Sequence, residues 1–464
     1  MVSWFLWLCA CRAPTSPRPV METQLGFDGV TQVSLERPDR LDVFWEAAAE
    51  AVDRYEVVAD AGGAEWGRWP ADSDAESLQV PLDPQTIDVD VRVEAVRGDH
   101  VDPGEGSLAI RLGVERLERL SHVPMVGVGD LGGDGDLLVV AGRDSGHSFM
   151  VFDISNPTRP ELLSTVDGMG WVRDVKLAFP LLFLTGECGC SDDPDAREAF
   201  DGIGMRVFDL SNPEEPRLLS EVGGTDAYAE HRVIHNLAVA GEHVYLSDTV
   251  ADAMPIFDVS EPSRPEKVAT YFPPDGVVHD QVVIGDRAYV AWWKGLAVLD
   301  VSDPSSPGLL VEHATPDLQA LHNIWPTEGG AYVLTSHEHG GGSVTIFEVQ
   351  DPTDVREVAR YDPFPGAIVH NVSVRDEIGF AAWYRNGLVA FDLADPTDPR
   401  TLATAETYDA DVVSDTGVVT PSPFNGAFGV WPFGNDGVVA VSDTTTGLHL
   451  FRFWPIRVGR SERP

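Results

Sequence analysis

The feature that most constrains this chain is a phrase that recurs at a near-constant spacing. Six segments share an apolar run ending in Asp, Glu or a close variant, a proline-rich turn and a second short run: MVFDISNPTRPELLSTV (150–166), RVFDLSNPEEPRLLSEV (206–222), PIFDVSEPSRPEKVATY (255–271), AVLDVSDPSSPGLLVEH (297–313), TIFEVQDPTDVREVARY (345–361) and VAFDLADPTDPRTLATA (389–405). Their starts lie 42 to 56 residues apart. A period in this range, built from short strands, is typical of propeller blades or solenoid units.

Each copy predicts a pair of strands joined by a tight turn. The first run alternates in the manner of a half-buried strand, and the second suits an exposed edge. The prolines between them cannot donate backbone hydrogen bonds, so a tight external turn is expected there. Two more strands are predicted upstream of each copy, for example RVIHNLAV (232–239) and HVYLSD (243–248). Four antiparallel strands in each repeat indicate a propeller blade.

The end of the chain predicts how the ring closes. The last repeat ends with a third strand, LHLFRF (448–453), and no fourth-strand phrase follows it. VERLERLSHV (114–123) carries the wording of a fourth strand ahead of the first blade, so we expect it to complete the last blade and remove an open edge. The predicted fold is all-β, a seven-bladed β-propeller over 114–453 preceded by a small β-sandwich.

The phrase FDISNPTRPELL and its variants resemble the LVIVD repeat, which occurs in bacterial and archaeal cell-surface proteins. The resemblance covers residues 114–453 and implies a propeller. It implies little about activity, because propellers carry many unrelated functions.

Residues 24–112 lack that phrase and resemble a fibronectin type III sandwich. The matching features are Trp45, Tyr55 and the alternating strand Val91–Val96. The tyrosine that this family carries before that strand is replaced by Asp88 or Val89, so the tyrosine corner is absent. Another seven-stranded sandwich remains the alternative, and either module would serve as a spacer or an adhesive unit.

The charge of the chain restricts its partners. With 32 Lys and Arg against 75 Asp and Glu, the formal net charge is −43. Nucleic acids and anionic membrane surfaces are bound by clustered Lys and Arg, so we expect neither as a partner. Strong acidity is compatible with an extracellular, cation-binding protein and equally with a charge that only maintains solubility.

The first residues resemble an export signal. Residues 2–10 are apolar but too few to span a bilayer, and Leu8-Cys9-Ala10-Cys11 resembles a lipobox in which Cys11 is lipidated. Residues 1–11 would then form the signal, 12–23 a flexible tether, and 454–464 a short tail. We expect an exported protein at the cell surface or in the periplasm, held to the outer membrane only by this lipid anchor. The alternative is a chance apolar end on a soluble protein.

Aligned blades share a second feature, a His followed by Asn or Asp at the start of the first strand. The four copies are His235-Asn236, His279-Asp280, His322-Asn323 and His370-Asn371, with Arg173-Asp174 and Phe428-Gly429 at the matching places of two other blades. Equivalent positions of successive blades converge on the axis, so we expect four imidazoles at one mouth of the channel. Such a cluster suits Zn, Cu, Fe or Ni. The alternative is structural: each His bonds the backbone of a neighbouring blade.

The ends of the second strands open at the same mouth and add candidate metal ligands. These are Glu187, Asp248, His337 and His339, the last two being two residues apart on one predicted strand and so expected on one side. Independently, Asp130, Asp134 and Asp136 in a glycine-rich turn offer hard oxygen ligands and form a candidate calcium site, with a plain hairpin turn as the alternative.

Candidate ligand-binding residues at the same mouth are Arg173, suited to an anion, and the aromatic residues Trp293, Trp383 and Tyr384, which either line a pocket or pack. The chain has no nucleophile elbow, phosphate loop, zinc-protease helix or dinucleotide fingerprint. The sequence therefore favours a surface-anchored binding or adhesion protein whose partner is a protein, a glycan or a small molecule. The alternative is a metal-dependent oxidoreductase or hydrolase that uses the histidine cluster.

Overall fold

The computed structural model describes residues 30–37, 40–61, 64–81, 88–98, 100–102, 108–111, 117–143, 147–186, 204–223, 227–231, 233–274, 276–315, 321–351, 354–409 and 422–453. They divide into two compact units, one up to Gly113 and one over Val114–Pro455. The second unit is the propeller.

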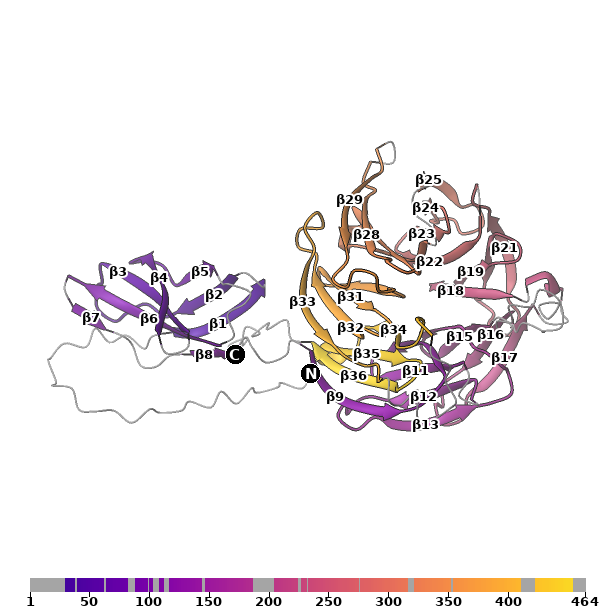
Figure 1. Cartoon of the computed structure of the whole chain (residues 1–464), viewed down its shortest axis with the longest axis horizontal. Coiled ribbons are helices and arrows are strands. Elements are labelled where there is room, and N and C mark those ends of the chain that lie inside the picture. Colours follow the sequence, from indigo (N-terminus) through magenta and orange to yellow (C-terminus); the bar gives the residue numbers. More distant parts are fainter. Residues whose placement is uncertain are drawn as a thin grey trace. The chain divides into compact units, whose positions relative to one another are not determined.

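Within the described residues, the propeller consists of seven four-stranded antiparallel sheets arranged around an axis (Figure 1). Six of them take their four strands consecutively from the chain. Their strands are β10–β13 (Val128–Asp134, Leu137–Gly142, Phe149–Asp153, Glu161–Val166), β14–β17 (Asp174–Ala178, Leu181–Gly186, Gly204–Asp209, Arg217–Val222), β18–β21 (Ile234–Ala240, His243–Asp248, Met254–Asp258, Glu266–Tyr271), β22–β25 (Val278–Ile284, Arg287–Trp292, Gly295–Asp300, Gly308–Ala314), β26–β29 (Leu321–Pro326, Tyr332–His337, Val344–Glu348, Arg356–Tyr361) and β30–β33 (Val372–Arg375, Ile378–Ala382, Leu388–Asp392, Arg400–Ala405).

The seventh sheet closes the ring with strands from both ends of this unit. β34 (Ala427–Trp431), β35 (Val438–Asp443) and β36 (Gly447–Phe453) are completed by β9 (Leu117–Pro124), which pairs antiparallel with β36. The register joins Leu448 to Val123 and Phe453 to Leu117. β9 therefore covers the edge of β36 that would otherwise be open.

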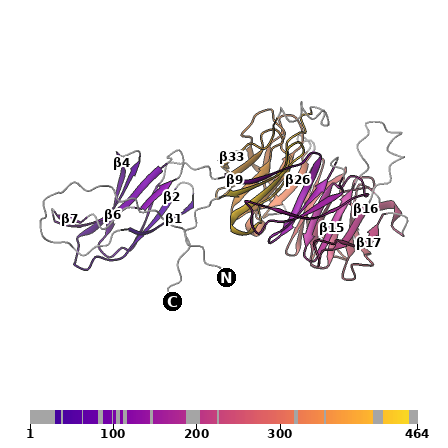
Figure 2. The ribbon, with the colours of Figure 1, turned by 90° about the horizontal axis from the view of Figure 1, so that it is seen from below.

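The repeated phrase has a structural cause in the turn between the third and fourth strands of each blade. The Asp that ends the third strand accepts a hydrogen bond from the backbone N–H two residues on, at 2.7 Å for Asp153 and Ser155 and 2.8 Å for Asp209 and Ser211. This Asx turn sets the direction of the proline-containing segment. Figure 2 shows β15, β16 and β17 side by side in one such blade.

Neighbouring blades are also joined at their outer strands. A serine in the fourth strand donates to the carbonyl of the proline in the next blade's turn, at 2.6 Å for Ser164 and Pro213 and again for Ser220 and Pro262. Apolar side chains fill the space between blades, as Phe149 and Phe208 do with ring centroids 5.2 Å apart. The repeat thus supplies both the blades and the links between them.

The first unit is a small β-sandwich. One sheet has the order β1-β2-β5 (Val30–Arg37, Arg40–Trp45, Ser77–Pro81), and the other has β4-β3-β6-β7 (Ala64–Asp72, Arg54–Ala61, Asp88–Arg97, His100–Asp102), with β8 (Leu108–Arg111) also paired to β6. Trp45 and Tyr55 lie in its core, and the Tyr55 hydroxyl accepts a hydrogen bond from Ala48 N–H at 2.8 Å. The fibronectin-type assignment stays a prediction.

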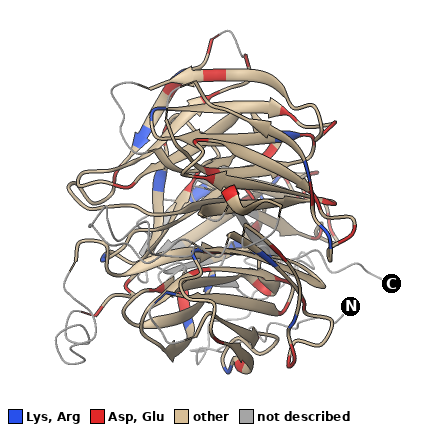
Figure 3. Ribbon diagram, turned by 90° about the vertical axis from the view of Figure 1, so that its right-hand side faces the viewer, with Lys and Arg blue, Asp and Glu red and all other residues tan. Residues whose placement is uncertain are grey.

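No helix in the described part of the chain has the length and apolar character needed to cross a bilayer. Acidic residues lie mainly near strand ends and in the connecting turns of the propeller, and the inner parts of the strands carry few charges (Figure 3). The predicted signal, lipobox Cys11, tether and tail lie outside the described residues.

Candidate metal centre in the propeller channel

In three of the histidine-bearing blades the innermost strand carries its polar residues at a local irregularity. In β18, β22 and β26 the pairing with the second strand shifts between Ile234 and Leu237, between Val278 and Asp280, and between Leu321 and Ile324. Such a bulge bends the strand and re-aims the side chains beside it. In these three blades it falls at the His-Asn or His-Asp pair. The histidines form one layer of the channel, called the upper layer, and the residues that follow them form the lower layer.

The upper layer brings the four predicted histidines together. Ring centroids are 4.0 Å apart for His235 and His279, 4.2 Å for His279 and His322, and 4.3 Å for His322 and His370. His370 also lies 3.7 Å from the ring of Phe428, which holds the matching position of the seventh blade. The histidines form a continuous arc on one side of the axis, as the repeat register predicts.

The two ring nitrogens have different roles. His279 Nδ1 lies 2.9 Å from the carbonyl oxygen of His322, and His370 Nδ1 lies 2.7 Å from that of Phe428. A carbonyl can only accept, so Nδ1 carries the proton in both rings and Nε2 keeps its lone pair. The bond to the next blade that the structural alternative expects is present, and it is also the bond that orients a histidine ligand for a metal.

Two overlapping groups of side chains have the spacing of a metal site. One is His235, His279 and His322, and the other is His322, Glu338 and His370. In each group one ligand atom from every residue lies within 4.8 Å of the others. His322 belongs to both groups, so they describe one continuous site. Within the described residues these are the only groups of three or more His, Cys, Asp or Glu with that spacing.

Glu338 and Tyr384 complete this site. Glu338 Oε2 lies 3.3 Å from His322 Nε2, Glu338 Oε1 lies 3.8 Å from His370 Nε2, and the Tyr384 hydroxyl donates to Glu338 Oε1. Tyr384 has a φ of +34°, which is unusual for a residue with a side chain. Gly426 allows this conformation, because a Cβ there would lie 2.2 Å from the Tyr384 carbonyl oxygen.

Burial controls the protonation of the cluster. Desolvation lowers the pKa of His279 and His370 well below the ordinary value, with neighbouring histidines adding to the effect. Burial also lowers the pKa of His322 to about 4, against the opposing charge of Glu338. Desolvation and the Glu338 charge raise the pKa of Tyr384 well above 10. At neutral pH the imidazoles of His279, His322 and His370 are thus neutral ligands and the phenol is a hydrogen-bond donor.

Arg173 holds the position of the histidines in the second blade. Its positive charge acts on His279, His322, His370 and Tyr384, lowering the pKa of each. Arg143 lies nearby, with its guanidinium 4.8 Å from the ring of Trp171 and 5.6 Å from that of Phe428. The mouth therefore combines neutral nitrogen ligands with fixed cationic groups.

Several predicted site residues lie elsewhere. His337 is the last residue of β27 and is buried beside Thr335, while His339 follows in the loop and is exposed, so the alternation expected for the pair ends with the strand. The residue between them, Glu338, faces the histidines instead. Asp248 is buried and holds its own turn by accepting from Val250 N–H, and it also bonds His231 Nδ1 at 2.7 Å.

Of the aromatic residues predicted to bind a ligand, only one lies beside the histidines. Trp383 is wholly buried in an interblade core beside Tyr361, so it packs there, and Trp293 is half exposed on a turn. Only Tyr384 of the three aromatic candidates reaches the histidines, at 5.3 Å between ring centroids for His370. Glu187 lies outside the described residues.

The calcium prediction is not supported by the geometry. Asp130 lies in the channel, four residues of strand away from Asp134, which is about 13 Å for an extended chain. Asp134 accepts from Phe179 N–H and Asp136 from Asn435, both outside the channel. The segment is the hairpin between β10 and β11, with Gly135 at a φ of +59°. The three carboxylates therefore do not converge.

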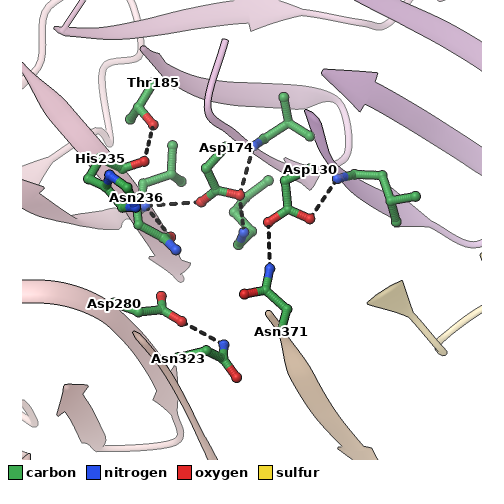
Figure 4. Close-up of polar contacts among 12 residues, drawn as sticks. Asp130, Asp174, Thr185, His235, Asn236, Asp280, Asn323 and Asn371 are labelled. Atoms are coloured by element: carbon green, nitrogen blue, oxygen red, sulfur yellow. Dashed lines mark hydrogen bonds and ion pairs between the residues drawn. The ribbon is translucent and has the colours of Figure 1, made fainter. Parts of the chain in front are cut away.

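Next to the histidines along the channel lies a second layer, the lower layer, which was not predicted as a site from the sequence. It consists of Asp130, Asp174, Asn236, Asp280, Asn323, Asn371 and Gly429, each one residue after its counterpart in the upper layer. Figure 4 shows these Asp and Asn side chains around a common space. Lys176 reaches into it and forms an ion pair with Asp174. The repeated Asn or Asp after each His was the available signal, whereas nothing in the repeat marks Lys176.

The layer is held by hydrogen bonds between blades. Asn323 Nδ2 donates to Asp280 Oδ2 at 2.6 Å, and Asn371 Nδ2 donates to Asp130 Oδ2 at 3.1 Å. Gly429 leaves room for Asp130, because a Cβ there would lie 2.3 Å from Asp130 Oδ1. Burial raises the pKa of Asp130 and of Asp280 to about 7, while the carboxylates outweigh burial and raise the pKa of Lys176.

Comparison with known proteins agrees with this architecture. Residues 134–168, 232–272 and 275–315 each match the family model of the LVIVD repeat. The second and third matches each span one complete four-stranded blade, β18–β21 and β22–β25, and the first spans β11–β13 with the end of β10. A comparison with curated proteins gives no match. The chain thus carries LVIVD repeats, and these repeats form blades of its β-propeller.

Proposed function

We propose that the upper channel layer binds a transition-metal ion and that the protein carries out metal-dependent chemistry there. The observation that carries the proposal is the division of roles between the two ring nitrogens of His279 and of His370. Nδ1 of His279 and of His370 is used by the neighbouring blade, which leaves Nε2 as a lone-pair ligand. The same strand position in successive blades brings one ligand atom from each of three blades within 4.8 Å of the others, which is the spacing that a shared ion needs.

The ligand set favours a d-block ion. Neutral imidazoles suit Zn, Cu, Fe and Ni, whereas Ca²⁺ and Mg²⁺ prefer oxygen ligands. His235, His279 and His322 would hold the ion, and a set of three histidines leaves coordination positions for water or substrate. A bound ion of this kind would act as a Lewis acid and lower the pKa of a bound water.

The chain's own groups support chemistry beside that ion. Glu338 is within 3.3 Å of His322 and can accept a proton, while Tyr384 donates a hydrogen bond to it and orients the carboxylate. Arg173 and Arg143 would favour an anionic substrate. A metal-dependent hydrolase or oxidoreductase fits this arrangement better than a module without chemistry.

The surface-anchored binding role predicted from the sequence is compatible with a metal centre. Its main support, the signal-like segment with Cys11, lies outside the described residues. Export and lipid anchoring therefore stay predictions, to be checked by cell fractionation of the full chain and of a Cys11→Ser variant.

Metal binding is tested directly by elemental analysis and zinc titration. The chelator-treated full chain should take up one Zn²⁺ and gain thermal stability, because an ion that binds only the folded state stabilises it. His279→Ala combined with His322→Ala should weaken zinc binding by at least about a hundredfold, since two ligands are lost. His147→Ala, at an exposed histidine paired with Asp167, is the matched control and should bind zinc normally.

Two results would overturn the proposal. One is a purified protein that contains no metal and whose thermal stability does not change with Zn²⁺, Cu²⁺, Fe²⁺ or Ni²⁺. The other is undiminished metal uptake by the double variant. The first result would leave the histidines as interblade hydrogen-bond donors.

A further inference from the structure

The other end of the channel holds a cavity that takes no part in the proposed metal site. Its volume is about 310 Å³, within the size range of small-molecule sites, and no histidine lines it. Its floor is the lower layer, which contains Asp130, Asp280 and Asn371. Its walls come from a third layer, two residues further along each inner strand, composed of Gly132, Lys176, Ala238, Val282, Trp325, Ser373 and Trp431.

The floor has an excess of hydrogen-bond acceptors. Asn371 is about nine-tenths buried, and its Oδ1 has no hydrogen-bond partner even though its Nδ2 donates to Asp130. Figure 4 shows this oxygen turned toward the central space of the layer. A buried acceptor without a donor is costly, so a ligand that donates hydrogen bonds would be stabilised there.

The floor also has an excess of negative charge. The charged residues that line the cavity are Asp130, Asp280 and Lys176, and the lysine makes its ion pair with a third carboxylate, Asp174. Asp130 and Asp280 receive hydrogen bonds from amide groups of Asn371 and Asn323. Because the pKa of Asp130 and of Asp280 is about 7, the three carboxyl groups outweigh the one ammonium group fully only above that pH, where they leave room for a further positive charge. Lys176 also demonstrates that this layer accommodates an ammonium group.

The walls are suited to an organic body. Trp325 and Phe433 stack with centroids 5.6 Å apart, and Trp431 lies 6.4 Å from Phe433. Gly133 makes space for Trp431, because a Cβ at residue 133 would lie 2.9 Å from the indole ring. Aromatic faces attract cations and cover alkyl groups.

We propose that this cavity binds a small organic ammonium ion, with its charged group at Asp130, Asp280 and Asn371 Oδ1 and its alkyl part against Trp325 and Trp431. An inorganic divalent cation is less suited to the site, because the carboxylates of the floor are not among the described groups close enough to share an ion. A neutral polyol would leave the excess negative charge unpaired.

Tryptophan fluorescence and calorimetry of the full chain test this proposal, with n-butylammonium as the probe. We expect saturable binding at one site, weakened about tenfold to a hundredfold in Asp280→Asn, because a hydrogen bond between charged partners is lost. Trp431→Leu should weaken binding and remove part of the fluorescence response. Glu214→Gln, which removes an equal charge from an exposed turn, should bind as the unmodified chain does.

The controls separate the alternatives. n-Butanol and glucose should bind far more weakly than n-butylammonium, and Ca²⁺ should not displace it. Equal binding of butanol or glucose would overturn the charge-based assignment, and displacement by Ca²⁺ would make the site a metal site. Absence of n-butylammonium binding to a chain that is folded by circular dichroism would also overturn it. Histidine variants of the upper layer should leave this binding intact, so the test is independent of the metal proposal.

Discussion

The upper and lower layers of the channel are built from adjacent residues of the same repeats, yet they respond to burial in opposite ways. The histidines are neutral groups whose burial lowers their pKa. The carboxylates one residue later are groups whose burial raises their pKa, and they need Lys176 as an internal counter-charge. A strand can therefore present a histidine layer and an ion-paired layer at adjacent residues, and only the first offers imidazole nitrogens to a metal.

The two layers should also differ in how stability depends on pH. A buried imidazole binds fewer protons in the folded chain than in the unfolded chain, so it lowers stability in acid. A buried carboxyl with a raised pKa binds more protons in the folded chain, so it lowers stability as the pH rises. Substitutions in the two layers should therefore have separable effects on stability.

The largest effect on stability is expected from removing the ammonium group of Lys176, which is the counter-charge of the lower layer. Lys176→Met should lower the free energy of unfolding by about 4 kcal/mol, because it leaves the buried carboxylate of Asp174 without its ion partner. Urea unfolding at pH 7 measures this. Lys294→Met, at an exposed position, is the matched control.

A double variant tests whether the loss of stability in Lys176→Met comes from the unpaired charge of Asp174. Lys176→Met combined with Asp174→Asn should recover part of the loss, since removing both charges is less costly than leaving one buried. A loss below about 1 kcal/mol for Lys176→Met would show that the layer does not depend on this ion pair.

The next largest effect is the loss of stability that the lower layer should cause as the pH rises. The Asp280 pKa is raised from 3.8 to about 7, so the free energy of unfolding should fall as the pH rises through this interval. The titration of Asp280 alone should lower the free energy of unfolding by about 3 kcal/mol between pH 5 and pH 8. Asp280→Asn cannot titrate and should show a correspondingly flatter profile in chelator-containing buffer. A profile parallel to that of the unmodified chain would contradict the raised pKa, and Asp303→Asn on the surface is the control.

The upper layer should respond in the opposite direction. The His322 pKa is lowered from 6.5 to about 4, so stability should be complete above pH 6.5 and fall as the pH decreases. For His322 alone the loss between pH 7 and pH 5 is about 2 kcal/mol. With metal removed by a chelator, His322→Asn should lose less stability on acidification than the unmodified chain. His147→Asn should not change the acid response, and an unchanged response in His322→Asn would refute the assignment.

The smallest effect concerns a neutral hydrogen bond that supports the upper layer. The Ser336 hydroxyl donates to the carbonyl oxygen of His370. Ser336→Ala should cost about 1 kcal/mol, the usual contribution of one neutral hydrogen bond. Ser263→Ala in an exposed turn should cost almost nothing. If Ser336→Ala cost as much as Lys176→Met, the distinction between a neutral and an ion-paired layer would fail.

The sequence predicted the architecture because the fold repeats locally. Each Asp-x-Ser-x-Pro phrase sets its own turn through a hydrogen bond two residues along, and the alternating runs on either side pair with each other. The pairing of β9 with β36 followed from counting strands, since an incomplete last blade requires a fourth strand from elsewhere. The strand position shared by four histidines likewise implied one common layer, because the blades are related by rotation about the axis.

The wrong or incomplete predictions concern residues outside that periodicity. His337 and His339 were expected to face the site, but β27 ends at His337, and the loop turns Glu338 inward instead. Asp130, Asp134 and Asp136 were expected to share an ion, but an extended strand separates the first from the others. Lys176 stands alone in its blade and gave no repeated signal.

The sequence by itself determined the blade, its turn, the closure of the ring and the register that aligns the histidines, because these depend on contacts repeated at a fixed period along the chain. Only the tertiary structure decided which atoms face the axis. Bulges re-aim adjacent side chains, and neighbouring blades bond Nδ1 of His279 and of His370 and leave Nε2. Burial changes the pKa of the enclosed groups. These effects arise from groups far apart in the chain, such as Asn371 and Asp130, whose juxtaposition exists only once the ring has closed.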